Sequence, residues 1–225
     1  MKTIFTYLLV LMILSTAAAA GKSVVYEVNG ASYEGYYTGA SGNAPLILLV
    51  HDWDGLTDYE VKRADMLAEM GYTVFAVDLF GAGVRPTKME DKRQHTGELY
   101  KDREKMRALL NTALKTAQSQ GADTGNAVAM GYCFGGAAVL EFARSGADMK
   151  GFVTFHGGLK TPEGQDYSKA KGKFLILHGT ATLALSVSRV LAACDIDEAR
   201  WPSFERALTA LTESEMLHEQ YVTTG

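Results

Sequence analysis

The chain has 225 residues, of which 47% are hydrophobic and 21% charged, a composition typical of a folded globular domain. This length fits one domain with a sizeable core, and α/β folds often reach it undivided. The net charge of -4 provides no basic surface for nucleic acid or an anionic membrane, so small soluble molecules are the expected partners.

The N-terminus has the pattern of a secretory signal peptide. Lys2 gives a positive start, residues 8–14 form an apolar run too short to span a bilayer, and small alanines follow. A buried N-terminal helix is the alternative, but it would need polar residues on one face, and residues 3–20 carry no charge. We expect residues 1–20 to be removed, leaving from about Gly21 a single periplasmic or secreted domain without a membrane span.

The rest of the chain alternates strands with helices. In chain order, the predicted strands are residues 23–28, 32–37, 46–50, 72–80, 127–130, 152–155 and 174–177. The predicted helices are residues 59–70, 99–117 and 134–144. Asn29-Gly30 is a dipeptide favoured in two-residue hairpin turns, and the continuous apolar run 46–50 is typical of a strand buried on both faces. The pattern predicts a mostly parallel sheet with helices on both faces and reactive groups at the carboxyl ends of its strands.

One strand–turn–helix segment carries a candidate nucleophile. An apolar strand leads into Gly131-Tyr132-Cys133-Phe134-Gly135, and a helix follows. This matches the Gly-x-nucleophile-x-Gly elbow of α/β-hydrolases, with Cys in place of Ser. The nucleophile of such an elbow has a strained backbone in a sharp turn, so the flanking residues must be small. We expect the sulfur of Cys133 to lie at a helix N-terminus, where the helix dipole favours a thiolate. Cys194, the second cysteine, could pair with it, but this local pattern favours chemistry.

A second loop supports the same interpretation. Residues 51–56, His-Asp-Trp-Asp-Gly-Leu, follow the buried strand 46–50 and precede a helix. In α/β-hydrolases this loop donates one oxyanion-hole N–H, and the residue after the nucleophile donates the other. We therefore assign the backbone N–H groups of Trp53 and Phe134 to an oxyanion hole. Alternatively, His51 and Asp52 belong to a polar helix-entry loop; Asp54 and Asp58 are expected to cap the helix.

These motifs together resemble the dienelactone hydrolase family. The resemblance covers residues 23–181 and rests on the segments 51–56, 77–81, 130–136, 155–158 and 177–180. It implies an α/β-hydrolase fold and hydrolysis of an ester or lactone through a thioester. It also implies that Asp52, at a position where the family usually has Glu, interacts with the thiol, and that Arg85 holds a substrate carboxylate unless it is a solvated loop residue.

The rest of the family's catalytic apparatus is not found where the resemblance places it. Thr182 stands where the family has the Asp that orients the base, and the Gly-x-x-His-x-Phe turn that carries the base is missing. Residues 182–225 form an atypical tail, so we expect the last strand and last helix of the fold to be absent. One account is a reading-frame shift near codon 182; others are a lineage change or a compensating residue such as His218. His156 and His178 are expected to be structural, and His95 to lie on the surface.

The leading hypothesis is a thiol-dependent hydrolase of small esters or lactones, impaired by the missing base. The alternative is a non-catalytic or redox-sensing thiol protein on the same scaffold, in which Cys133 reacts with oxidants. No cofactor or metal is expected. Gly81-x-Gly83 suggests a dinucleotide loop, but Pro86 stands where a third glycine would be needed.

Overall fold

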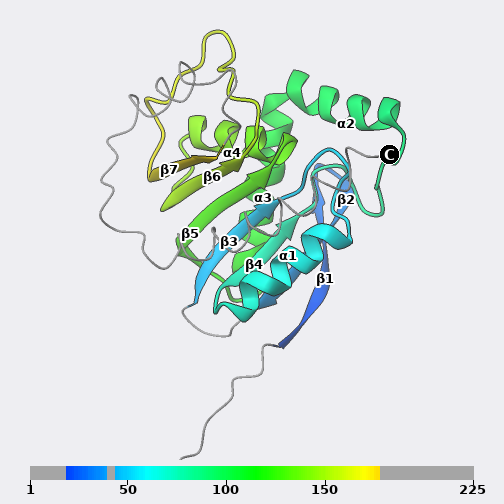
Figure 1. The fold of residues 1–225 in the computed structure, drawn as a ribbon, viewed down its shortest axis with the longest axis vertical. Helices are drawn as coiled ribbons and strands as arrows, with labels where there is room; N and C mark the ends of the chain where they lie inside the picture. The colour runs from blue at the N-terminus through cyan, green and yellow to red at the C-terminus, as the bar shows by residue number, and fades with distance from the viewer. Residues whose placement is uncertain (1–18, 40–43, 178–225) are drawn as a thin grey trace, which may run out of the picture.

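In the computed structural model, which describes residues 19–39 and 44–177, one mixed sheet runs through the middle of the molecule (Figure 1). Its strands are β1 (Ala19–Val28), β2 (Ala31–Gly39), β3 (Pro45–Val50), β4 (Thr73–Val77), β5 (Asp123–Tyr132), β6 (Gly151–Phe155) and β7 (Lys173–Leu177). They lie in the order β1-β2-β4-β3-β5-β6-β7. β2 pairs antiparallel with β1 and β4, and all other neighbours are parallel. The predicted mostly parallel α/β sheet is confirmed.

The predicted hairpin forms the antiparallel edge of the sheet. Asn29 and Gly30 both have positive φ, 52° and 78°, which is the geometry of a type I′ turn. β1 and β2 then pair from Val28–Ala31 outward to Ala19–Gly39.

Helices cover both faces of the sheet and divide the core in two. α1 (Asp58–Glu69) packs on one face, whereas α3 (Arg103–Ser119) and α4 (Phe134–Arg144) pack on the other. β3 shows the alternation, because Ile47 and Leu49 belong to the α1 side of the core. Leu46, Leu48 and Val50 belong to the opposite side. A strand covered on both sides must be apolar throughout, which is why residues 46–50 form an unbroken run.

The order of the strands creates a switch point beside β3. The connection from β3 leads to β4 on one side, and the chain then crosses to β5 on the other side. At such a point the loops after two adjacent strands diverge and leave a crevice at their carboxyl ends. The loops that carry the candidate site, after β3 and after β5, are therefore neighbours.

The prediction of a single helix over residues 99–117 is wrong. Two helices occupy this region, α2 (Met89–Lys101) and α3, and they meet at Asp102, whose φ and ψ are -108° and 79°. The Asp102 carboxylate accepts a hydrogen bond from the Lys105 N–H at 2.9 Å and so caps α3. Leu99 belongs to α2, whose largely polar sequence gave no apolar periodicity.

Two further boundaries differ from the prediction. The strand predicted over residues 72–80 ends at Val77, because the Asp78 carboxylate accepts hydrogen bonds from the N–H groups of Phe80 and Gly81 and turns the chain. The cap of α1 is Thr57, rather than Asp54 or Asp58. Its side chain accepts from the Tyr59 N–H, and Glu60 completes a capping box.

Several predictions lie outside the described residues. These are residues 1–18 of the predicted signal peptide, Cys194, His178, His218, and the tail 182–225 in which the last strand and helix were expected to be absent. Ala19 and Ala20, the last two residues of that predicted peptide, belong to β1. Within residues 19–39 and 44–177, no helix is long and apolar enough to cross a membrane.

Candidate active site

The backbone of Cys133 is strained, as a nucleophile elbow requires. Its φ is 50° and its ψ is -112°, and α4 begins at the next residue. The Cys133 N–H donates to the Phe155 carbonyl at 2.9 Å, and its own carbonyl accepts from the Ala137 N–H at 3.2 Å. A β-carbon at this φ normally costs of order 1–3 kcal/mol. These two bonds, one to β6 and one into α4, hold the residue in place.

The glycines of the elbow allow the start of α4 to approach the end of β3 closely. A β-carbon on Gly135 would lie 2.4 Å from the carbonyl oxygens of Val50 and His51. One on Gly131 would lie 2.4 Å from the carbonyl of Gly135. Both contacts are with rigid backbone, so no side chain fits at either position. The close approach brings the loop after β3 beside the candidate nucleophile.

His51 is the first residue of that loop and it is completely buried. Its Nδ1 lies 2.6 Å from the Asp52 carbonyl, and its Nε2 accepts a hydrogen bond from the Leu79 N–H at 3.1 Å. Burial lowers the pKa of His51 to about 4. The ring is therefore neutral near pH 7, with its proton on Nδ1, and ties the end of β3 to the end of β4. It is not placed to act as a base.

Carboxylates of the same loop lie within electrostatic reach of the sulfur. The Asp52 carboxylate accepts from the Asp54 N–H at 2.8 Å, which fixes a tight turn around Trp53. Lys92 of α2 pairs with Asp54 at 2.5 Å and lies 5.2 Å from the centre of the Trp53 ring. Burial and the neighbouring charge of Asp54 raise the pKa of Asp52, although the Asp54 N–H opposes them.

The Cys133 thiol is half-buried and free. Its pKa is raised, whereas its position at a helix N-terminus predicted a lowered pKa. Burial is the largest cause of the increase, and the charges of Asp52 and Asp54 add to it. The backbone N–H of Phe134 lowers the pKa but does not outweigh these causes. The helix N-terminus therefore does not make Cys133 a thiolate in this resting arrangement.

Aromatic rings line the side of the elbow that faces α2. Phe80 packs against Phe134 with centroids 5.6 Å apart, and His95 stacks on Phe80 at 5.1 Å. Tyr100 meets Phe134 edge-on at 5.4 Å. His95 and Tyr100 were not expected here, because α2 was not predicted and only its presence brings them to the site. His95 is half-buried against Phe80 rather than a surface residue.

Two residues considered in the sequence analysis, Arg85 and His156, have surroundings unlike those of the elbow. Arg85 donates to the carbonyl of its neighbour Val84 at 2.8 Å and lines a hollow of about 510 Å³ between β2 and the start of α1. Cys133 is not among the residues that line this hollow. His156, at the end of β6, is exposed with a φ of 41°, and its charge reaches Asp52. The substrate role of Arg85 stays a prediction.

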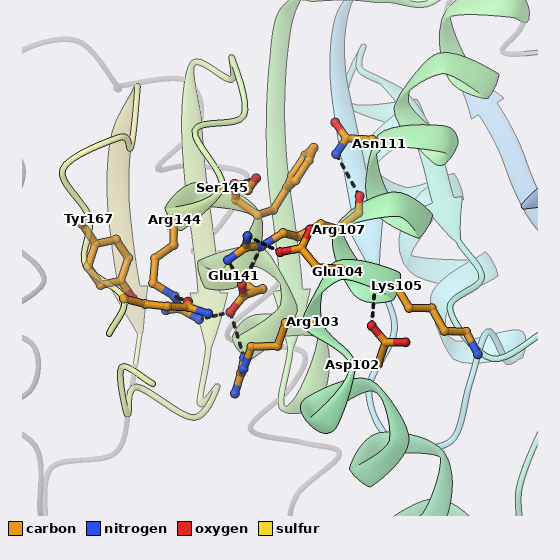
Figure 2. Close-up of polar contacts among 12 residues, drawn as sticks. Asp102, Arg103, Glu104, Lys105, Arg107, Asn111, Glu141, Arg144, Ser145 and Tyr167 are labelled. Atoms are coloured by element: carbon orange, nitrogen blue, oxygen red, sulfur yellow. Dashed lines mark hydrogen bonds and ion pairs between the residues drawn. The ribbon is translucent and has the colours of Figure 1, made fainter. Parts of the chain in front are cut away.

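A buried carboxylate on α4 anchors the helix that carries the elbow (Figure 2). Glu141 is completely buried and accepts hydrogen bonds from Arg103 at 2.8 Å, Arg107 at 2.6 and 2.8 Å, and Arg144 at 2.7 Å. Burial alone would raise the pKa of Glu141, but the arginines outweigh it and hold the pKa below its usual value. Arg144 also donates to Tyr167 at 2.7 Å, so the cluster joins α3, α4 and the segment before β7.

In the part of the chain that the structure describes, no three His, Cys, Asp or Glu side chains gather in a way that could hold a metal ion. The side chains at the elbow are instead a thiol, carboxylates and aromatic rings.

The parallel sheet, its switch point and the strained elbow after β5 define an α/β-hydrolase. The sequence model of the dienelactone hydrolase family matches residues 33–188, well over half of the chain. The chain therefore belongs to the dienelactone hydrolase family, as its motifs predicted, and is a hydrolase that acts on ester bonds.

Solved structures agree with this assignment. The protein called m3DLH is 27% identical with a TM-score of 0.73, over 86% of this chain and 96% of that one. A dienelactone hydrolase-like promiscuous phosphotriesterase from metagenomic libraries is 28% identical with a TM-score of 0.71, over 79% of this chain and 77% of that one. A dienelactone hydrolase from Anabaena variabilis shares the fold at 17% identity, with a TM-score of 0.59 over 85% and 94%. No curated protein matches the sequence.

Proposed function

We propose that this chain is a thiol-dependent hydrolase of small esters or lactones, with Cys133 as its nucleophile. The observation that carries the proposal is the backbone of Cys133, whose φ of 50° at the start of α4 presents a free, half-exposed thiol beside the loop after β3. A structural cysteine has no need of such strain, which is concentrated at functional sites.

The proposed reaction has two steps. The Cys133 thiolate attacks the carbonyl carbon, a C–S bond forms, and the carbonyl oxygen takes up negative charge opposite the N–H groups of Trp53 and Phe134. The C–O bond then breaks, the alkoxide leaves with the electron pair and takes a proton from water, and a thioester remains. Water attacks the thioester and loses one proton to solvent, the C–S bond breaks, and the carboxylic acid and the Cys133 thiolate are released. Because Asp52 and burial keep the thiol neutral at rest, the thiolate forms only when a base or the bound substrate shifts this balance.

The test is to trap the thioester. Intact-protein mass spectrometry after exposure to p-nitrophenyl acetate should show one acetyl group, and peptide mapping should place it on Cys133. Cys133→Ala should remove both the adduct and the turnover. Equal turnover in the Cys133→Ala protein contradicts the proposal. Oxidation of Cys133 to a sulfenate or mixed disulfide, with no acylation, would favour the redox-sensing alternative instead.

We also propose that the protein is exported. Lys2 and the uncharged apolar residues that follow support a cleaved signal peptide. Mass spectrometry of the protein secreted by a bacterial host should give an N-terminus near Gly21. Retention of the full N-terminus in the cytoplasm would contradict it.

A further inference from the structure

Tyr100 lies beside the Cys133 elbow on an element that the proposed mechanism does not yet use. It belongs to the last turn of α2, and its ring meets the ring of Phe134, the residue after the nucleophile, edge-on at 5.4 Å. Burial raises the pKa of Tyr100, and the charge of Cys133 raises it further. The hydroxyl is therefore within electrostatic reach of the sulfur and carries its proton near pH 7.

The Tyr100 hydroxyl is available to a bound molecule. Within residues 19–39 and 44–177 it makes no hydrogen bond, either to the sulfur or to another group. Tyr100 is 39% exposed, so solvent and small molecules reach it although its ring contacts Phe134. A protonated hydroxyl in this position can donate to an oxygen that approaches Cys133.

The ring of Tyr100 contacts an arginine that belongs to the buried cluster around Glu141. The guanidinium of Arg103 lies 5.6 Å from the ring centre, and the same side chain donates to the buried Glu141 at 2.8 Å. Because Glu141 also binds Arg107 and Arg144, the position of Arg103 is fixed by two helices (Figure 2). The Tyr100 ring thus contacts both Phe134 and an arginine whose own position is fixed.

We propose that Tyr100 is a further catalytic residue, whose hydroxyl donates a hydrogen bond to the leaving-group oxygen of an ester bound at Cys133. This inference rests on the proposed function. The N–H groups of Trp53 and Phe134 are assigned to the carbonyl oxygen, which leaves the second ester oxygen for a donor from another element. As the C–S bond forms and the C–O bond breaks, the leaving oxygen keeps the electron pair, Tyr100 stabilises its charge, and water supplies the proton of the released alcohol.

The experiment compares leaving groups in single-turnover acylation of Cys133, followed by intact-protein mass spectrometry at alkaline pH. The esters are p-nitrophenyl, phenyl and trifluoroethyl butyrate, which share one acyl group. In Tyr100→Phe the p-nitrophenyl rate should change by less than about twofold, because that leaving group needs no help. The phenyl and trifluoroethyl rates should fall by about tenfold or more, the loss expected for one hydrogen bond to a charged oxygen.

The matched control is Tyr37→Phe, which removes the hydroxyl of a partly buried residue of β2, in the antiparallel part of the sheet. It should leave all three rates unchanged. Equal losses for all three esters in Tyr100→Phe, or no loss at all, would overturn the role of Tyr100 while leaving the proposed function intact. If the unmodified protein is not acylated, or if Cys133→Ala is acylated equally, the proposed function and this inference both fail. Thermal unfolding confirms that Tyr100→Phe is folded.

Discussion

The side chains around Cys133 and the backbone that presents it have opposite effects on the ionisation of the thiol. The elbow and the start of α4 favour a thiolate, yet burial and the charges of Asp52 and Asp54 raise the pKa of the thiol. Burial is the largest cause, and the carboxylates add to it because they belong to the loop after β3, which Gly135 allows to pack directly against the elbow. A thiol kept neutral in this way is protected from oxidation, which weighs against a redox-sensing role.

Asp52→Asn should make Cys133 more reactive. The amide keeps an oxygen that can accept from the Asp54 N–H, but it removes a negative charge, so the pKa of the thiol should fall and more thiolate should exist at any given pH. The rate of alkylation by iodoacetamide, followed on the Cys133 peptide by mass spectrometry, should rise with pH in both proteins and reach its midpoint at lower pH in the variant.

Asp58→Asn serves as the control, because this exposed residue of α1 is not among the charges that act on Cys133. Its alkylation profile should overlay that of the unmodified protein. An alkylation midpoint that stays the same or moves upward in Asp52→Asn would show that Asp52 does not oppose the thiolate.

At the scale of helices and strands, two buried carboxylates stabilise the helices that lie next to the site. Glu141 joins α4 to α3 through Arg103 and Arg107 and also binds Arg144 of α4. Glu60 completes the capping box of α1, next to the loop that carries Asp52. Glu141 has compensating charge, whereas within residues 19–39 and 44–177 no basic side chain forms an ion pair with Glu60, so their responses to substitution and pH should differ.

Glu141→Gln should destabilise the fold by about 3 kcal/mol, because it leaves three arginines without the buried negative charge that they bind. The value is at the low end for a broken buried pair, since Arg103 and Arg107 still reach solvent. Urea unfolding measures the change. Glu104→Gln, which removes only the 84% exposed partner of Arg107, should change the unfolding free energy by less than about 0.5 kcal/mol. Equal effects of the two substitutions would contradict this account.

Glu60 should make stability depend on pH. Burial raises its pKa to about 7, although hydrogen bonds from the Thr57 hydroxyl and N–H oppose the increase. A carboxyl whose folded pKa is raised contributes stability that is complete below its unfolded pKa and is lost as pH rises through the folded pKa. Its contribution should therefore decline between about pH 4 and pH 7, by roughly 3 kcal/mol in total.

Glu60→Gln keeps the acceptor of the capping box and removes the ionisation. The difference in unfolding free energy between the variant and the unmodified protein, measured by urea titration across pH 4 to 8, should grow in favour of the variant as pH rises. A constant difference across this range would contradict the assigned pKa.

The elements whose signal is local were predictable from sequence, and those that depend on tertiary contacts were not. The apolar runs of β3 and β5, the Asn29-Gly30 turn and the whole of α4 were predicted, because burial on both faces and glycine geometry leave a direct mark on sequence. The site residues at the elbow followed from the same signals. α2 was missed because its sequence is largely polar and Leu99 is its one buried residue, and so the contacts of His95 and Tyr100 with Phe80 and Phe134 could not be foreseen.

Across the whole molecule, the described sheet supplies only part of what a hydrolase of this family needs. The candidate nucleophile and the two candidate oxyanion amides follow β3 and β5. The family resemblance places the base and its orienting acid after β7, where Thr182 replaces the expected Asp. Formation and breakdown of the thioester should therefore be affected differently, because a thiolate formed at alkaline pH can attack without a base, whereas water needs one.

The protein should accordingly show a stoichiometric burst of p-nitrophenol at alkaline pH, followed by turnover slowed on the order of 10⁴-fold by the missing base. Added imidazole should accelerate the slow phase in proportion to its concentration and leave the burst unchanged, because it replaces the absent base in attack on the thioester. Cys133→Ala should abolish the burst. Rapid turnover without imidazole that is lost in His218→Ala would instead mean that the chain carries its own base and that Thr182 does not mark the loss of one.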